Sequence, residues 1–303
     1  MSENNNISSL QDKQYVTTEE GIQLALSPAE YEEMKKLQKY ILEIMIVVDE
    51  FCRNNNITYY LGEGSLLGAV RHKGFVPWDD DADIVMPRED YERFLKLAAD
   101  GLKDGYQLDC VDTNPKHWSI ISTVQITRQT EFEKTMYNGA ALYCGPCIDI
   151  FPLDYAPNAD AFNLKIRSKC IRILRRALWI KSGVHTKSKY NTLKKKLFYY
   201  YPCKFICSVY SIQSLHKKLS RLMLKTNDSN NKYLVNFASL YTVNKETFDK
   251  NLFGKPVEIE FEGHKFYAPS QSEQILKIIY NDYTAMPPVE KRKSKHHFNN
   301  FVE

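Results

Sequence analysis

An acidic cluster that leads directly into an apolar run constrains this sequence more than any other feature. Asp79, Asp80, Asp81 and Asp83 lie within five residues, and the apolar run 84–86 follows at once. The run predicts a buried strand over 81–86, in which alternate side chains share a face, so Asp81 and Asp83 should project together. Adjacent ionised carboxylates repel each other, and a divalent cation removes that repulsion. Oxygen ligands suit Mg²⁺ or Mn²⁺. We therefore interpret the cluster as a metal site, with a solvated acidic turn as the alternative.

A further carboxylate lies inside a second β-prone run. Asp149 interrupts the apolar residues of 148–151, and an acid buried in such a run is costly unless it has a partner. On a neighbouring strand it would complete a two-metal site, or accept the proton of an attacking hydroxyl. The alternative is an exposed position on an edge strand. The expected catalytic and metal-binding residues are Asp81, Asp83 and Asp149, and Asp79 and Asp80 rank behind them as ligands.

Glycines and cations precede the aspartates. The segment 62–64 reads as a loop before a short helix over 65–70 that Gly74 stops. Free backbone N–H groups at Gly64 and Ser65 would suit a phosphate. The spacing matches neither a Walker loop nor a dinucleotide fingerprint. Arg71, His72 and Lys73 could hold phosphate oxygens, Arg71 with two parallel hydrogen bonds. Their alternative is a solvated helix end, where cations suit the helix dipole.

The rest of the chain alternates helix and strand signals without a regular βαβ series, which indicates an α+β fold. A capped amphipathic helix should begin after Ser27 and end near 54–56, and a second helix should cover 88–99. Strands are expected over 57–61, 120–127 and 148–151, with an extended segment at 75–78. A hairpin over 257–267 should turn at 262–264, and Ser270 should cap a helix to about 279.

Basic residues are concentrated in one segment. Residues 161–227 hold 17 of the 41 Lys and Arg residues and no Asp or Glu, although the whole chain has a net charge of only +4. The segment has a helical pattern broken near Gly183 and Pro202. Such a block suits an anionic partner. Apolar and aromatic residues over 197–212 favour a membrane surface over nucleic acid. The alternative is a solvated helical surface.

Targeting and cysteine usage point to the cytoplasm. The polar N-terminus lacks a secretory pattern and no apolar run is long enough to span a bilayer. The seven cysteines fit a reducing compartment. We expect a cytoplasmic protein, peripheral at the inner face of the cell membrane. Cys144-Gly145-Pro146-Cys147 has the sequence of a thioredoxin active site, but a β-prone run follows where a helix is needed, so we discount a redox role. A zinc site with Cys203 and Cys207 is a weaker alternative.

Three segments together resemble the LicD family. The first and most specific is 60–84, which reads YLGEGSLLGAVRHKGFVPWDDDADI; its Gly-Ser, short helix and Asp-x-Asp also resemble the polymerase-β-like nucleotidyltransferases. The other two are 148–154 (IDIFPLD) and 279–283 (IYNDY), the latter followed by Pro287-Pro288. Ser65 stands where family members often have Thr, and Asn281 where they usually have Gly.

The resemblance implies a polymerase-β-like nucleotidyltransferase core, a mixed sheet with flanking helices, plus a basic helical insertion. The expected parts are a flexible tail (1–26), a catalytic core (27–160), the insertion (161–227) and a C-terminal part that completes the catalytic domain (228–303). Metal binding carries over to Asp81, Asp83 and Asp149. Donor binding carries over to Gly64, Ser65, Arg71 and Trp78, with His72 and Lys73 as further candidates.

The resemblance also implies transfer of a phospho-alcohol, typically phosphocholine from CDP-choline, with release of CMP. The acceptor would be a hydroxyl of a cell-surface or lipid-linked glycan, such as lipopolysaccharide, teichoic acid or capsule. Fukutin-type ribitol-phosphate transferases are similar.

Two other functions stay open. A nucleotidyltransferase would move NMP from an NTP and release pyrophosphate. A non-catalytic module would bind nucleic acid or membrane through 161–227, and its binding would be sensitive to salt but indifferent to Asp81 and Asp83.

Overall fold

The computed structural model describes residues 15–130, 132, 135–137, 140–143, 145–158, 162–185 and 190–294. Its centre is a mixed sheet in the order β11-β10-β9-β4-β3. Strand β6 also pairs with β9, and β5 pairs with β6. The strands of this sheet are β3 (Tyr60–Leu61), β4 (Asp83–Pro87), β5 (Tyr106–Asp109), β6 (Ser122–Ile126), β9 (Cys147–Ala156), β10 (Tyr233–Val235) and β11 (Thr247–Asp249). The predicted α+β class with a mixed sheet and flanking helices is confirmed.

Strand β9 organises the sheet. It pairs in parallel with β4 along one side, and along the other side it pairs antiparallel with β6 and then with β10. Seven of its ten residues are buried, and helices α1 (Pro28–Asn54) and α3 (Arg88–Gly101) pack against it. At the start of α3, the Arg88 guanidinium donates hydrogen bonds of 2.8 and 3.0 Å to the two oxygens of the buried Asp154 carboxylate in β9.

The helices begin and end for local reasons. Helix α1 starts with the predicted cap, because Ser27 and Glu30 exchange hydrogen bonds between side chain and backbone. Helix α2 (Glu63–His72) ends at Lys73, which adopts φ 54°. Gly74 is needed for close approach, since a Cβ there would lie 2.1 Å from a carboxylate oxygen of Glu262. The predicted hairpin is confirmed as β12 (Val257–Phe261) and β13 (His264–Ala268), joined at Glu262 and Gly263, both with positive φ.

The N-terminal segment differs from the prediction. Within the expected flexible tail 1–26, residues 15–26 form a small antiparallel pair, β1 (Val16–Thr17) and β2 (Gln23–Leu24). Leu24 and Leu26 are buried in one cluster with Val76 and Trp78. This contact joins segments about fifty positions apart, so local sequence could not reveal it. The positions before Tyr15 lie outside the described residues.

Three local predictions are wrong. Segment 75–78 is not fully extended, because the Asp79 N–H donates to the Val76 carbonyl oxygen and closes a turn. Ser270 does not cap the last helix: α8 (Ser272–Tyr280) begins after Gln271, and the Ser270 hydroxyl donates to the Leu252 carbonyl oxygen. Pro202 does not break its helix but lies in the first turn of α6 (Tyr201–Val209).

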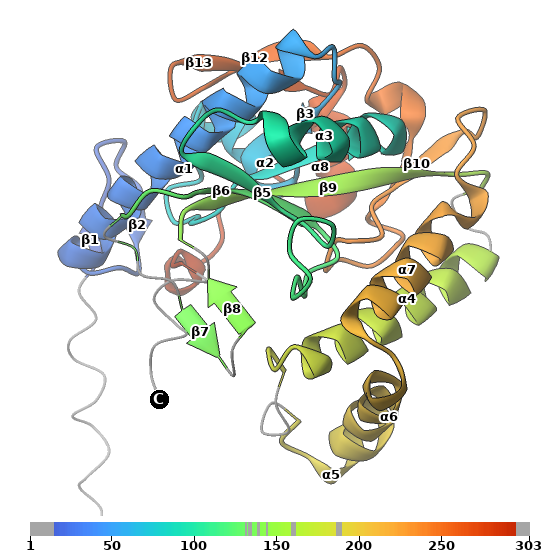
Figure 1. The fold of residues 1–303 in the computed structure, drawn as a ribbon. Coiled ribbons are helices and arrows are strands. Elements are labelled where there is room, and N and C mark those ends of the chain that lie inside the picture. The colour runs from blue at the N-terminus through green and yellow to red at the C-terminus, as the bar shows by residue number, and fades with distance from the viewer. Residues whose placement is uncertain are drawn as a thin grey trace, which may run out of the picture.

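The basic segment folds into helices, two of which share the hydrophobic core of the sheet. Helix α4 (Phe162–Lys181) packs on α6 and on α7 (Ile212–Met223), and α5 (Leu193–Lys195) joins α6 through a π-helical turn (Lys196–Tyr200). Buried residues of α4 and α7 belong to the same hydrophobic cluster as the sheet. Figure 1 shows α5 and α6 as the part of this helical group that extends furthest from the sheet. The predicted domain boundaries remain predictions.

The remaining elements are short. They are the pair β7 (Thr135–Tyr137) and β8 (Ala140–Tyr143), and the 3₁₀ turns Leu224–Thr226, Lys250–Leu252 and Val289–Lys291. Among the described residues, no helix has the length and apolar character needed to cross a membrane.

Candidate metal and phosphate site

The parallel pairing of β4 and β9 brings two predicted acids together. Asp83 and Asp149 are register partners on neighbouring strands, and the Asp149 N–H donates to the Ala82 carbonyl oxygen at 2.8 Å. Register partners on adjacent strands project from the same face of a sheet. Asp83 is buried and Asp149 is half-buried. The predicted juxtaposition of these two carboxylates is confirmed, although their role as ligands remains a prediction.

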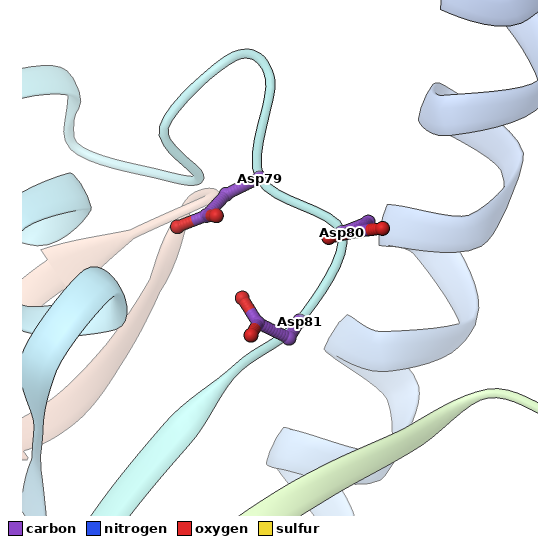
Figure 2. A group of neighbouring side chains, drawn as sticks. All are labelled: Asp79, Asp80 and Asp81. Atoms are coloured by element: carbon purple, nitrogen blue, oxygen red, sulfur yellow. The ribbon is translucent and has the colours of Figure 1, made fainter. Parts of the chain in front are cut away.

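The turn before β4 supplies three more carboxylates. One oxygen from each of Asp79, Asp80 and Asp81 lies within 4.8 Å of the others, and this is the only such group of potential ligands among the described residues. Figure 2 shows Asp79 and Asp81 directed toward a common space, while Asp80 lies beside α1. The Asp80 carboxylate also accepts a 2.5 Å hydrogen bond from the Ser294 hydroxyl. Asp79 therefore lies with Asp81 in this group, and the ranking of the ligands remains a prediction.

The electrostatics of Asp83 show how closely the acids converge. Burial raises its pKa well above the usual carboxyl value, and the negative charges of Asp81, Glu63, Asp149 and Asp79 add to that rise, in this order. A buried carboxylate surrounded by like charges is destabilised when ionised, and a nearby cation reverses that effect. The donor set, all carboxylate oxygens, is the type that Mg²⁺ and Mn²⁺ prefer.

The start of α2 approaches these acids more closely than most residues would permit. A Cβ on Gly64 would lie 2.5 Å from an Asp79 carboxylate oxygen and 3.7 Å from one of Asp83. Gly64 was expected in a loop and Ser65 at the start of a helix, and both lie in the first turn of α2. N–H groups in the first turn of a helix lack partners within the helix and can bind an anion. The predicted phosphate contact at Gly64 therefore keeps its physical basis.

Ser65 has a positioning contact. Its side chain is buried, and its hydroxyl oxygen accepts a 2.8 Å hydrogen bond from the Asp83 N–H. The Gly62 N–H in turn donates to the Asp83 carbonyl oxygen at 3.0 Å. These bonds fix the first residue of β4 against α2. A direct contact of Ser65 with a substrate stays a prediction.

Arg71, His72 and Trp78 form one cluster. The Arg71 Nε–H donates to His72 Nε2 at 2.8 Å, a second guanidinium N–H donates to the Tyr283 carbonyl oxygen at 3.0 Å, and the guanidinium carbon is 5.9 Å from the Trp78 ring. Burial and the Arg71 charge lower the pKa of His72 to about 4, so His72 is neutral at pH 7. Two of the five Arg71 donors are thus engaged within the protein, and His72 acts there as an acceptor.

Lys73 is placed differently. Its side chain is exposed, and its Nζ lies 3.9 Å from a carboxylate oxygen of Glu260 in the β12–β13 hairpin. Its carbonyl oxygen accepts a 2.7 Å hydrogen bond from the Glu262 N–H. The structure brings Lys73 to the hairpin through its own backbone and side chain. Its predicted substrate contact remains a prediction.

Sequence reasoning missed Glu63 and Tyr280. The Glu63 charge raises the pKa of Asp83 and also the pKa of the buried Tyr280 phenol, where burial is the largest cause. Tyr280 reaches this region because α8 packs against α2. The ring of Tyr241 lies 6.1 Å from that of Tyr280, at nearly a right angle. Tyr280 lies in the segment 279–283 that resembles the LicD family, but the sequence does not reveal that this segment lies beside the acids.

The cysteines give no second metal centre within the described part of the chain. Cys203 and Cys207 are buried with residues of α4 in a small cluster of their own. Cys147 begins strand β9, as expected for a segment that does not open a helix. Cys144 lies outside the described residues, so the Cys144–Cys147 pair cannot be placed.

Comparison with known proteins agrees with the segments that carry the site. The profile of the LicD/FKTN/FKRP nucleotidyltransferase domain matches residues 56–206, which include Glu63, Asp149 and the aspartates of 79–83. The lipopolysaccharide cholinephosphotransferase LicD of Haemophilus influenzae is 27% identical over 269 residues, 87% of this chain and 97% of the relative. The chain belongs to the LicD family.

Two further relatives match shorter parts of the chain. An uncharacterized protein of Rickettsia typhi is 34% identical over 97 residues, which are 31% of each chain. An uncharacterized protein of Rickettsia prowazekii is 46% identical over 50 residues, 16% of this LicD family chain and 19% of the relative. The match to the Haemophilus protein therefore carries the comparison.

Proposed function

We propose that this LicD family member transfers phosphocholine from CDP-choline to a glycan hydroxyl on lipopolysaccharide or a lipid-linked precursor, and that its sheet is a polymerase-β-like nucleotidyltransferase core. The observation that carries the proposal is that Asp79 and Asp81 share one group of potential ligands and that their charges, with that of Asp149, act on Asp83, its partner in β4. A relative that this chain matches over almost its full length is named a cholinephosphotransferase. The similarity covers 97% of that relative, so the assignment rests on almost its full length and not on one isolated domain.

The residues suit a Mg²⁺ or Mn²⁺ ion. Asp79, Asp81, Asp83 and Asp149 would hold it, and the bound ion would neutralise charge on the donor diphosphate. In the transfer, the glycan oxygen forms a bond to the phosphorus that carries choline, and the bond from that phosphorus to CMP breaks. Asp149, which is half-buried in β9, would accept the hydroxyl proton. Arg71 and the first turn of α2 would offset charge on the phosphates.

Turnover with defined donors tests the reaction. The protein is incubated with Mg²⁺, a lipopolysaccharide or lipid-linked glycan extract, and CDP-choline, CDP-ribitol or CTP, and released CMP and pyrophosphate are measured separately. We expect CMP release with CDP-choline that falls by about a thousandfold in Asp81→Ala and Asp83→Ala. Asp100→Ala, on the exposed end of α3, is the control and should retain activity.

The other outcomes separate the alternatives. Pyrophosphate release from CTP would establish the NMP transferase instead. CMP release from CDP-ribitol alone would keep the chemistry and change the alcohol. Absence of turnover with all donors, together with equal nucleotide binding by wild type and the Asp variants, would show that these aspartates are not the site.

A further inference from the structure

Exposed apolar side chains are concentrated on one small part of the molecule. Of the large hydrophobic residues that are exposed, seven lie within the continuous helical run 193–209, formed by α5, the π-helical turn and α6. Leu193, Phe198 and Phe205 expose 80%, 64% and 72% of their surface. Contiguous exposed apolar surface with a polar rim marks an interaction site. We call residues 193–209 the helical tip.

These residues form a stripe rather than a scatter. Leu193, Leu197, Tyr201, Phe205 and Val209 recur at every fourth position and are all exposed. Positions four apart are neighbours on a helix surface, so each of these residues lies beside the next along the tip. The opposite face is occupied, since Cys203 and Cys207 pack with Ala177, Ile180 and Tyr190. Helix α6 thus holds the tip to α4, and the tip presents apolar side chains to solvent.

The charge around the stripe has one sign. Lys194, Lys195 and Lys204 are exposed within the tip, and no Asp or Glu occurs anywhere in 161–227. The structure also separates these lysines from the basic residues of α4 that serve the fold. Arg175 is buried and donates to the carbonyl oxygens of Ala238 and Ser239, and Arg172 donates to those of Leu240 and Tyr241. The basic residues of 161–227 that can face a partner are therefore fewer than the sequence alone predicts.

We propose that the helical tip inserts its apolar stripe into the interface of an anionic lipid bilayer, with its lysines at the headgroups. A helix with apolar and aromatic residues on one face and Lys on its flanks lies in the plane of such an interface. Each basic residue near an anionic surface adds attraction, and the apolar face adds burial. The tip extends away from the sheet (Figure 1), so it can reach a surface ahead of the body. This proposal deepens the proposed function, because it places a lipid-borne acceptor near the enzyme.

Flotation of the full-length protein with lipid vesicles tests the tip without any substrate. Vesicles of phosphatidylcholine with phosphatidylglycerol are compared with phosphatidylcholine alone at low salt. The apolar variant is Leu197→Ser/Tyr201→Ser/Phe205→Ser. Its control is Leu97→Ser/Leu240→Ser/Val257→Ser, which removes exposed apolar residues elsewhere. The charge variant is Lys194→Gln/Lys195→Gln/Lys204→Gln, with Lys96→Gln/Lys103→Gln/Lys255→Gln as its control.

We expect wild type and both controls to float with the anionic vesicles. The apolar variant should bind at least about tenfold more weakly, and the charge variant should lose roughly fivefold for each lysine. Thermal unfolding confirms that the variants are folded. Absence of vesicle binding by wild type would overturn the proposal. So would an apolar variant that binds like wild type, or tighter binding to a single-stranded oligonucleotide that depends on the lysines alone. Because no donor is present, failure here leaves the transfer reaction untouched.

Discussion

Gly64 is the residue at which the site depends most directly on the lack of a side chain. A Cβ there would meet the Asp79 carboxylate at 2.5 Å, whereas the backbone of Gly64 is helical and would accept alanine without strain. Gly64→Ala should therefore displace Asp79 and lower turnover by at least about tenfold, with little change in unfolding temperature. Gly101→Ala, where the nearest atom is 3.5 Å away, is the matched control. Full activity in Gly64→Ala would remove Asp79 from the site.

Asp83 makes a prediction about stability. Because its pKa is raised by burial and by Asp81, Glu63, Asp149 and Asp79, the folded protein holds this proton more tightly than the unfolded chain. The resulting stability is complete below about pH 4 and is lost as pH rises toward the folded pKa. Asp83→Asn removes the charge, so in the absence of a divalent cation at pH 7 it should be more stable than wild type, by roughly 1 kcal/mol or more.

Urea unfolding from pH 4 to pH 8, with and without Mn²⁺, measures both effects. Wild type should lose more stability than Asp83→Asn as pH rises, and Mn²⁺ should restore more stability to wild type than to the variant. Parallel pH curves for the two proteins would mean that Asp83 is not under electrostatic stress. Equal stabilisation of both proteins by Mn²⁺ would place the ion elsewhere.

Sequence alone identified these acids but not how all of them come together. The apolar runs after Asp83 and around Asp149 marked the two strands that pair at these residues. Alternation along a strand does not account for Asp81, because β4 begins at Asp83 and both Asp79 and Asp81 lie in the turn before it. Glu63 and Tyr280 were missed because α2 and α8 meet only in the tertiary structure. No periodicity records such a contact.

The elements are joined at one buried ion pair whose loss should be costly. Arg88 begins α3 and Asp154 lies in β9, and both side chains are nearly inaccessible. Asp154→Asn should leave the guanidinium charge buried without a counterion and lower the free energy of unfolding by about 3–5 kcal/mol. Glu43→Gln, which opens the exposed pair with Arg128, is the control and should cost less than about 1 kcal/mol. Chemical denaturation measures both, and similar losses would contradict a structural role for Asp154.

Most elements could be predicted from the sequence because their signals are local. The capping box at Ser27, the alternating three- and four-residue spacing of apolar residues in α1 and the Glu262-Gly263 turn each specify an element by themselves. The N-terminal pair β1–β2 could not be predicted, because only burial of Leu24 and Leu26 against Trp78 orders it. Asn281, in place of the expected Gly, adopts φ 70°, so the turn survives in a conformation that favours glycine.

At the scale of the molecule, the helical tip should affect turnover only when the acceptor is carried in a membrane. With an acceptor carried in anionic vesicles, the variant Leu197→Ser/Tyr201→Ser/Phe205→Ser should turn over at least about tenfold more slowly than wild type, because it no longer gathers at the surface. With a delipidated glycan fragment in solution the two should be equal. Assays of CMP release under both conditions measure this, and an equal loss with the soluble acceptor would show that the tip affects the site itself.

The position of β9 in the sheet has a consequence for synthesis of the chain. β9 can pair with β4 and β6 once residue 156 has been made, but its remaining partner, β10, begins at residue 233. At translation rates of about 5–20 residues per second, the far end of this largely buried strand waits for a period on the order of seconds. An unpaired apolar edge is prone to wrong pairing. A nascent chain of this protein should therefore be most dependent on chaperones while the ribosome is translating the basic helices.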